Sequence, residues 1–152
     1  MLTATEYLAR DHEEHEQLLC NLVRAMARDI SPEEVRAAWL PFEHSLLEHL
    51  DAEERSLFCV FTQAHRSEID ALRSEHRRIR YAVIELSVSM ELHSVKKAAL
   101  DDLLALIRAH TVHEHRTLHK WLDEDEGISS RRAVLAMLAR RTERTRALSA
   151  DD

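Results

Sequence analysis

The chain has 152 residues, which is enough for a single domain with a core of its own. Its formal net charge of −7 disfavours nucleic-acid binding by the chain as a whole, and no apolar run is long enough to cross a membrane. One glycine and two prolines predict long helices with short connections and no strands. The eleven histidines are unusual, because a helical bundle has no structural need for so many.

The first predicted helix spans about residues 3–28, where apolar and histidine residues recur at alternating spacings of four and three. The second begins at Ser31, a typical N-cap residue that is followed by Pro32 and two acidic residues. Pro41 lies inside this second helix and lacks the N–H that a helix interior uses. We therefore expect a kink or a short break near Leu40.

The third predicted helix spans about residues 67–91, and the fourth runs from a cap at Ser94 to about residue 123. Each of the four helices has a face of regularly spaced apolar and histidine residues, and the turns between them are short. The sequence therefore predicts an all-α fold, an up-down-up-down four-helix bundle that occupies residues 1–125.

An additional C-terminal helix is expected within residues 128–152, beginning at Ser129 or Ser130 and reaching about residue 147. It is basic, with six arginines and one glutamate between residues 131 and 146. We expect its apolar face to pack on the bundle, or the helix to extend from it, with the arginines in solvent. The alternative is a docking surface for a partner or a second subunit.

The two cysteines, Cys20 and Cys59, lie within helical patterns and do not form a metal-type pair. We expect both to be buried free thiols, which are typical of a reducing compartment. The N-terminal sequence also lacks the basic and apolar segments of a signal peptide. These features predict a cytoplasmic protein.

One short pattern occurs twice in the chain. HLDAEERSLF at residues 49–58 and HTVHEHRTLH at residues 110–119 share the form H-x-x-x-E-x-R-[S/T]-L. The similarity extends upstream, where His12 aligns with His76. The sequence therefore predicts two similar helical hairpins with approximate two-fold symmetry. Six polar side chains at core positions are expected to converge between them: His12, His49, Glu53, His76, His110 and Glu114.

Two carboxylates in a core need positive charge nearby, because a buried unpaired carboxylate is costly. Protonated histidines are one source of charge, and a pair of metal ions is the other, which we favour. A histidine and a glutamate at i and i+4 share a helix face, so the histidine reaches one ion and the glutamate reaches the gap between two. A solvent-derived oxo or hydroxo bridge would complete five ligands for each ion and leave one position open. Such a site suits iron and a dioxygen species, with zinc or manganese as alternatives.

The chain resembles the hemerythrin-like proteins, the HHE cation-binding group, over about residues 5–122. The residues that carry the resemblance are, in chain order, His12, His49-x-x-x-Glu53, His76 and His110-x-x-x-Glu114. The resemblance implies a hemerythrin-like bundle with a non-haem centre of two iron ions. In that centre the four histidines would be terminal ligands and the two glutamates would be bridges.

Two departures from the oxygen-carrying hemerythrins disfavour reversible oxygen carriage. Those proteins have a His-x-x-x-His pair on the third helix, whereas this chain has Arg80 four residues after His76. Their last helix carries His-x-x-x-x-Asp, whereas this chain has His115 at that spacing and a glutamate one residue earlier.

Several residues near the expected ligands have less defined roles. His15 lies one turn after the first of the six and is a candidate fifth histidine ligand; otherwise it hydrogen-bonds to a ligand or packs at the bundle end. Glu54 and His115 occupy equivalent positions in the repeat, where we expect partners of the ligands or surface groups. Both are also candidate proton relays. His113 and His119 are expected on the surface or as weak additional groups at the site.

The sequence and the resemblance together predict a di-iron protein that reacts with hydrogen peroxide or dioxygen in a catalase-like, peroxide-consuming reaction. The alternative is a non-catalytic module that binds, senses or stores iron, O2 or NO. A role in delivering iron for cluster repair is less favoured, because no cysteine-bearing region precedes the first helix. The expected partners are these small molecules, without nucleic acid or membrane, and the sequence leaves monomer and dimer both open.

Overall fold

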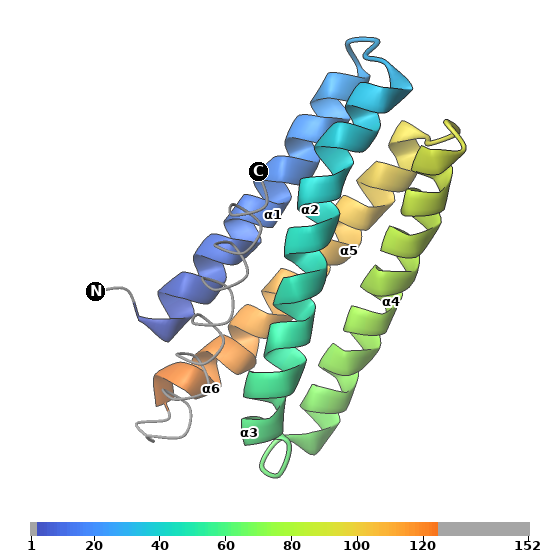
Figure 1. The fold of residues 1–152 in the computed structure, drawn as a ribbon. Helices are drawn as coiled ribbons and strands as arrows, with labels where there is room; N and C mark the ends of the chain where they lie inside the picture. Colours follow the sequence, from blue (N-terminus) through green and yellow to red (C-terminus); the bar gives the residue numbers. More distant parts are fainter. Residues whose placement is uncertain (1–2, 125–152) are drawn as a thin grey trace, which may run out of the picture.

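The computed structural model describes residues 3–124, which are helical apart from short connections. Four long helices lie side by side (Figure 1), and α1 packs on α2 and α5 while α4 packs on the same two helices. The predicted four-helix bundle is therefore confirmed. The predicted C-terminal helix lies outside the described residues. The elements are α1 (Ala4–Met26), α2 (Pro32–Glu53), the π-helical turn η1 (Glu54–Phe58), α3 (Cys59–Phe61), α4 (Arg66–Glu91), α5 (Lys97–Arg116) and α6 (Leu118–Glu124).

The first two helices begin with reciprocal side-chain caps. Ser31 accepts a hydrogen bond from the backbone N–H of Glu34, and its own N–H donates to the Glu34 carboxylate at 2.8 Å. Thr3 and Glu6 form the same arrangement at the start of α1. Each capping box satisfies two N–H groups that the first turn of a helix leaves free. The start predicted for the second helix at Ser31 is thus explained by a defined interaction.

The cap expected at Ser94 is wrong, because α5 begins three residues later with Lys96 in the N-cap position. His93 adopts a left-handed backbone conformation with a φ of 52° and turns the chain out of α4. The backbone N–H of Ser94 then donates to the carbonyl oxygen of Ser89 at 2.9 Å. Ser94 therefore completes the end of α4 rather than the beginning of α5.

The break expected near Leu40 is absent, since α2 runs without interruption through Pro41. Proline removes the hydrogen bond to the carbonyl oxygen of the residue four positions earlier, which is Ala37. Both Pro41 and Ala37 are exposed, so water can hydrate that carbonyl group. The proline thus lies on the face of α2 where its cost is smallest.

The irregular backbone lies instead just after the two repeat glutamates. α2 passes into the π-helical turn η1 immediately after Glu53. The predicted fourth helix is two helices, because Thr117 leaves the helical conformation with φ and ψ of −122° and −85°. Glu53 and Glu114 therefore each stand within three residues of a change in helical register.

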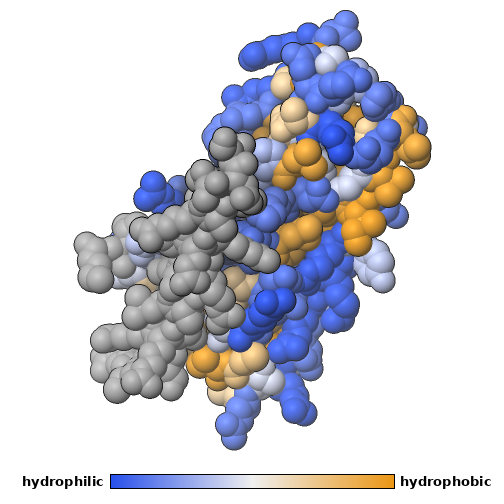
Figure 2. Space-filling model, viewed as in Figure 1, coloured by the Kyte–Doolittle hydropathy of each residue, from blue (hydrophilic) through white to orange (hydrophobic). Residues whose placement is uncertain are grey.

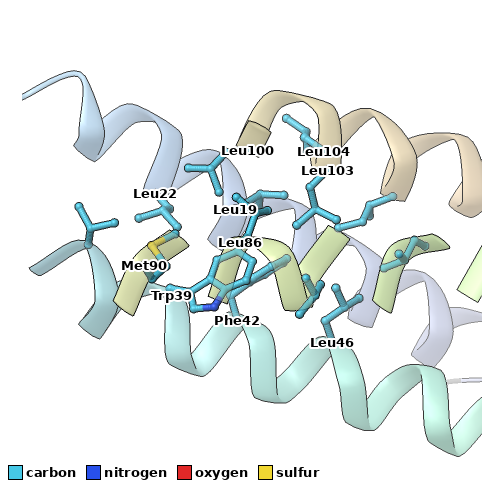
Figure 3. Close-up of a cluster of buried hydrophobic side chains, with 14 of the residues drawn as sticks. Leu19, Leu22, Trp39, Phe42, Leu46, Leu86, Met90, Leu100, Leu103 and Leu104 are labelled. Carbon is cyan, nitrogen blue, oxygen red and sulfur yellow. The ribbon is translucent and has the colours of Figure 1, made fainter. Parts of the chain in front are cut away.

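Two hydrophobic clusters fill the bundle, one at each end. The larger cluster, shown in Figure 3, lies toward the α1–α2 and α4–α5 connections and packs Trp39 and Phe42 against leucines from the other helices. The smaller cluster lies toward the α3–α4 connection and includes Phe58 and Trp121. The polar layer that carries the repeat histidines and glutamates lies between them, and it belongs to neither cluster.

The expectation that both cysteines are buried is wrong. Both are free, but Cys59 is exposed and Cys20 is only partly buried. The π-helical turn directs Leu57, Phe58 and Phe61 into the core, which leaves Cys59 on the outer face.

The surface is mostly hydrophilic in Figure 2, with hydrophobic residues along the side that α4 occupies in Figure 1. None of the helices in residues 3–124 has the length and apolar character of a membrane span.

Candidate metal centre

Six side chains from the four long helices converge between the two hydrophobic clusters. Glu53, His76 and Glu114 are fully buried, and none of the six is more than 6% exposed. α1 and α4 each contribute one histidine, and α2 and α5 each contribute a histidine and a glutamate one turn apart. The six are the residues named from the sequence repeat: His12, His49, Glu53, His76, His110 and Glu114.

The six side chains form two overlapping sets of four. One set contains His12 and His49, and the other contains His76 and His110. Glu53 and Glu114 belong to both sets, and within each set the nitrogen and oxygen atoms lie within 4.8 Å of one another. Each hairpin therefore supplies one histidine pair and one glutamate, and the two glutamates stand between the pairs.

The histidines of each pair face one another through Nε2. These atoms are 3.0 Å apart in His12 and His49 and 3.1 Å apart in His76 and His110. The carboxylates approach the same nitrogens, with Glu114 Oε2 3.0 Å from Nε2 of His12 and Glu114 Oε1 3.0 Å from Nε2 of His110. All four imidazoles thus direct the same ring nitrogen to one region of the core.

The glutamate oxygens in this region lie close to imidazole nitrogens but form no hydrogen bond with them. All four carboxylate oxygens of Glu53 and Glu114 are buried, and none accepts a hydrogen bond from the described residues. Burial without compensation is costly for a carboxylate, so positive charge must be present. Imidazole nitrogens and carboxylate oxygens are a donor set that suits iron, zinc and manganese, and two shared carboxylates suit a pair of such ions. The residues present therefore fit two metal ions.

In the metal-free chain, protons supply part of the missing charge. Burial opposes protonation of His49, but the charge of the adjacent Glu53 and hydrogen bonding to Asp11 together outweigh it and raise the pKa of His49 to about 10. Burial is likewise outweighed by the glutamates at the second pair, where the pKa of His76 rises to about 11 and that of His110 to about 9. Burial and Glu114 both oppose ionisation of Glu53, yet the neighbouring histidines lower the pKa of Glu53 to about 2.

Protonated histidines alone compensate the charge of the two buried glutamates poorly. The raised pKa values place a proton on both His76 and His110, although their Nε2 atoms are only 3.1 Å apart. Two protonated rings at this distance repel each other, because like charges disfavour ionisation of both. A metal ion bound by both nitrogens removes the repulsion and still neutralises the carboxylates. The geometry therefore favours metal ions over imidazolium partners.

Three of the four imidazoles have a carboxylate on the other ring nitrogen. Nδ1 of His49 lies 3.3 Å from Asp11, Nδ1 of His76 lies 2.9 Å from Glu54, and Nδ1 of His110 lies 2.8 Å from Glu75. A carboxylate at this position fixes the tautomer and the orientation of a metal-binding histidine. Such partners are typical of metal centres rather than of isolated core histidines.

Sequence reasoning missed two of these carboxylates. Asp11 and Glu75 directly precede the histidines of α1 and α4, and each bonds the histidine of the other helix in its own hairpin. The repeat carried this signal, because an acidic residue precedes the aligned histidine in both halves. Glu54, named from the sequence as a candidate partner, also accepts a bond from Arg80 at 2.6 Å. Hydrogen bonds from His76 and Arg80, aided by their positive charges, lower the pKa of Glu54 to about 2.

Three further histidines near the candidate ligands differ in burial and in their contacts. His15 is buried beside His49, with Nε2 2.9 Å from the hydroxyl of Ser45, and it belongs to neither set of four. His115 is exposed, and His113 is half-buried with Nδ1 2.7 Å from Glu75.

Of the two expectations for His119, a position on the surface is wrong, because only 2% of the residue is exposed. The turn at Thr117 places the start of α6 against α1, and the ring of His119 lies nearly parallel to that of His12. Burial and the charge of His12 lower the pKa of His119 to about 4, so its ring is neutral at pH 7.

The fold and the two four-residue sets define a helical bundle with a buried metal-binding core. The chain belongs to the hemerythrin family, because the family model described as the hemerythrin HHE cation binding domain matches residues 3–144. The resemblance seen in the sequence is thus confirmed. Comparison with curated proteins and with solved structures found no match.

Proposed function

We propose that this protein binds a pair of iron ions with an oxo or hydroxo bridge and consumes hydrogen peroxide or dioxygen. One observation carries the proposal: Glu53 and Glu114 belong to both sets of four ligand atoms. A carboxylate that belongs to both sets could serve both ions, so Glu53 and Glu114 would be the ligands that the two ions have in common. His12 and His49 would hold one ion, and the other histidine pair would hold the second.

A bound iron pair supplies two-electron redox chemistry and a template for both oxygen atoms of a peroxide molecule. The chain's own residues hold and enclose that pair. Asp11, Glu54 and Glu75 orient three of the four imidazoles. With its lowered pKa, Glu54 stays ionised at neutral pH, so it is better suited to positioning His76 than to donating a proton.

The enclosure of the centre favours a small substrate. All six ligand candidates are buried, and hydrophobic clusters close the bundle on both sides. The surface pockets near Trp39 and near Trp121 are lined by none of the six. Hydrogen peroxide, dioxygen and nitric oxide are small enough to reach such a buried centre.

The proposal is tested by loading the protein anaerobically with ferrous iron, adding hydrogen peroxide and recording the released oxygen with an electrode. We expect oxygen release from the wild-type protein and from Glu13→Ala, which changes an exposed carboxylate on α1. We expect none above free iron from Glu114→Ala, because that change removes a carboxylate common to both sets.

The alternative function, a non-catalytic module for iron, O2 or NO, makes a different prediction in the same experiment. The wild-type protein would then retain its iron without releasing oxygen from peroxide. Adding NO to the ferrous protein would change its absorption spectrum, and removing the gas would reverse the change. Peroxide turnover equal in wild type and Glu114→Ala would contradict both functions of this centre.

A further inference from the structure

His119 is a buried histidine that the candidate metal centre does not use. It is 2% exposed, and neither ring nitrogen has a hydrogen-bond partner among residues 3–124. Burying two unpartnered polar nitrogens costs free energy that a leucine or phenylalanine at the same place would avoid. The position therefore needs an explanation beyond packing.

The sequence repeat supplies the comparison. When Glu114 is aligned with Glu53, His119 aligns with Phe58. The Phe58 ring packs on His76 with centroids 5.0 Å apart, just as the His119 ring packs on His12 with centroids 5.6 Å apart. A phenylalanine meets this packing requirement in one half of the bundle, so the nitrogens of His119 serve another purpose in the other half.

The residues beside Phe58 and His119 also differ between the two halves. Next to Phe58, the carboxylate of Glu54 is held by His76 and by the guanidinium of Arg80. In the second half, His115 aligns with Glu54. His115 is exposed, and its ring centroid lies 4.3 Å from that of His119. Nδ1 of His12 is also buried without a hydrogen-bond partner.

Three imidazoles therefore form a row from solvent to the centre. It begins at the exposed His115, passes through His119 and ends at His12, which belongs to one of the two four-residue sets. Neutral imidazole is a common ligand of divalent transition-metal ions. In the other half, the two aligned positions are Phe58, which has no ligand atom, and Glu54, whose carboxylate is already held by His76 and Arg80.

We propose that His115 and His119 form an entry site that binds an incoming divalent transition-metal ion and passes it to His12. The inference rests on the proposed metal-binding function and specifies how ions reach the buried layer. The two outer imidazoles bind the ion transiently and are not ligands of the loaded centre. The entry site makes the two halves of the bundle inequivalent even though their ligand sets are similar.

The experiment follows cobalt(II) uptake by the full-length, metal-free protein in a stopped-flow spectrometer, using the visible absorption of bound cobalt. His119→Leu removes the buried nitrogens and keeps an apolar side chain, and His115→Gln removes the exposed imidazole. His44→Gln is the matched control, because His44 is exposed on α2 with its Nε2 near Glu48 and lies outside both ligand sets. Equilibrium cobalt content is measured on each protein after long incubation.

We expect uptake at least about tenfold slower in His119→Leu and His115→Gln than in wild type and His44→Gln, with the same final cobalt content. Removing buried unpartnered nitrogens should leave the metal-free His119→Leu protein at least as stable as wild type. Uptake at the wild-type rate in both variants would overturn the entry site. A lower final content in His119→Leu would also overturn it, since His119 would then be a permanent ligand. Absence of cobalt binding by wild type would instead refute the metal-binding function itself.

Discussion

The four candidate histidine ligands differ in the partner of Nδ1, the ring nitrogen that faces away from the centre. His49, His76 and His110 each have a carboxylate on this atom, and His12 has none. A carboxylate partner makes an imidazole a better metal ligand and holds its orientation. If each histidine pair binds an ion, as proposed, we expect the ion at His12 and His49 to be held less firmly than the ion at His76 and His110.

The change Asp11→Asn tests the role of these carboxylates. It keeps the size of the side chain and removes the charge that faces Nδ1 of His49. We expect metal affinity to fall by about tenfold to a hundredfold while saturating metal still gives the wild-type content. Competition with a chelator of known affinity measures the change, and Glu13→Gln, on the exposed face of α1, is the control. Equal affinities in wild type and Asp11→Asn would show that Asp11 does not support the ligand.

The raised histidine pKa values predict how the metal-free protein depends on pH. A histidine whose pKa rises from 6.5 to between about 9 and 11 stabilises the fold fully below pH 6.5, and loses that contribution as the pH rises through the folded-state value. Each such group removes up to about 1.4 kcal/mol per pH unit in this range. Glu53, with its pKa lowered from 4.5 to about 2, loses its contribution in the opposite direction, as the pH falls below 4.5.

Urea unfolding at several pH values checks this dependence with and without metal. In a chelator, the free energy of unfolding should fall steadily from about pH 6.5 to pH 9 and beyond. With metal bound, the imidazoles are held by the ion rather than by protons, so the fall should be much smaller. A metal-free protein that becomes more stable over this range would show that the histidines are not protonated in the fold.

At the scale of helices, regular elements were predictable and local irregularities were not. The start at Ser31 followed from the capping residue and the acidic first turn, and the structure supplies the capping box. The turn η1 and the turn at Thr117 carry no comparable signal, because neither contains proline or glycine. π-helical turns are common at functional sites, and here one directly follows Glu53. The burial of His119 was missed for the same reason, since a straight helix gives a different register after Thr117.

The capping box gives a stability prediction for α2. Ser31→Ala removes the side chain that accepts from the Glu34 N–H, and it should lower the free energy of unfolding by about 1 kcal/mol. Ser74→Ala is the control, because Ser74 is exposed within α4, where alanine is the better helix former. Urea unfolding of both variants gives the comparison. A larger loss from Ser74→Ala than from Ser31→Ala would contradict the cap.

At the scale of the whole molecule, two similar hairpins combine around one polar layer. The sequence repeat predicted this arrangement, because histidine and glutamate recur at i and i+4 in both halves at positions that periodicity assigns to the core. The structure brings all six side chains together. The carboxylates behind the histidines were harder to predict, since Asp11 and Glu75 bond across to a neighbouring helix and their partners depend on helix packing. His15 was a candidate ligand by spacing alone, but it lies beside Ser45 outside both sets.

The most direct test of this account is the number of metal ions per chain. Protein purified without chelator, and protein reconstituted with ferrous iron, should both be analysed for metal content beside Glu53→Ala and Glu114→Ala. We predict two ions per wild-type chain, one for each set of four ligands, and fewer in both variants, because each removes a carboxylate that both sets share. A wild-type chain that stays fully folded and binds no metal, or only one ion, would contradict the two-metal centre.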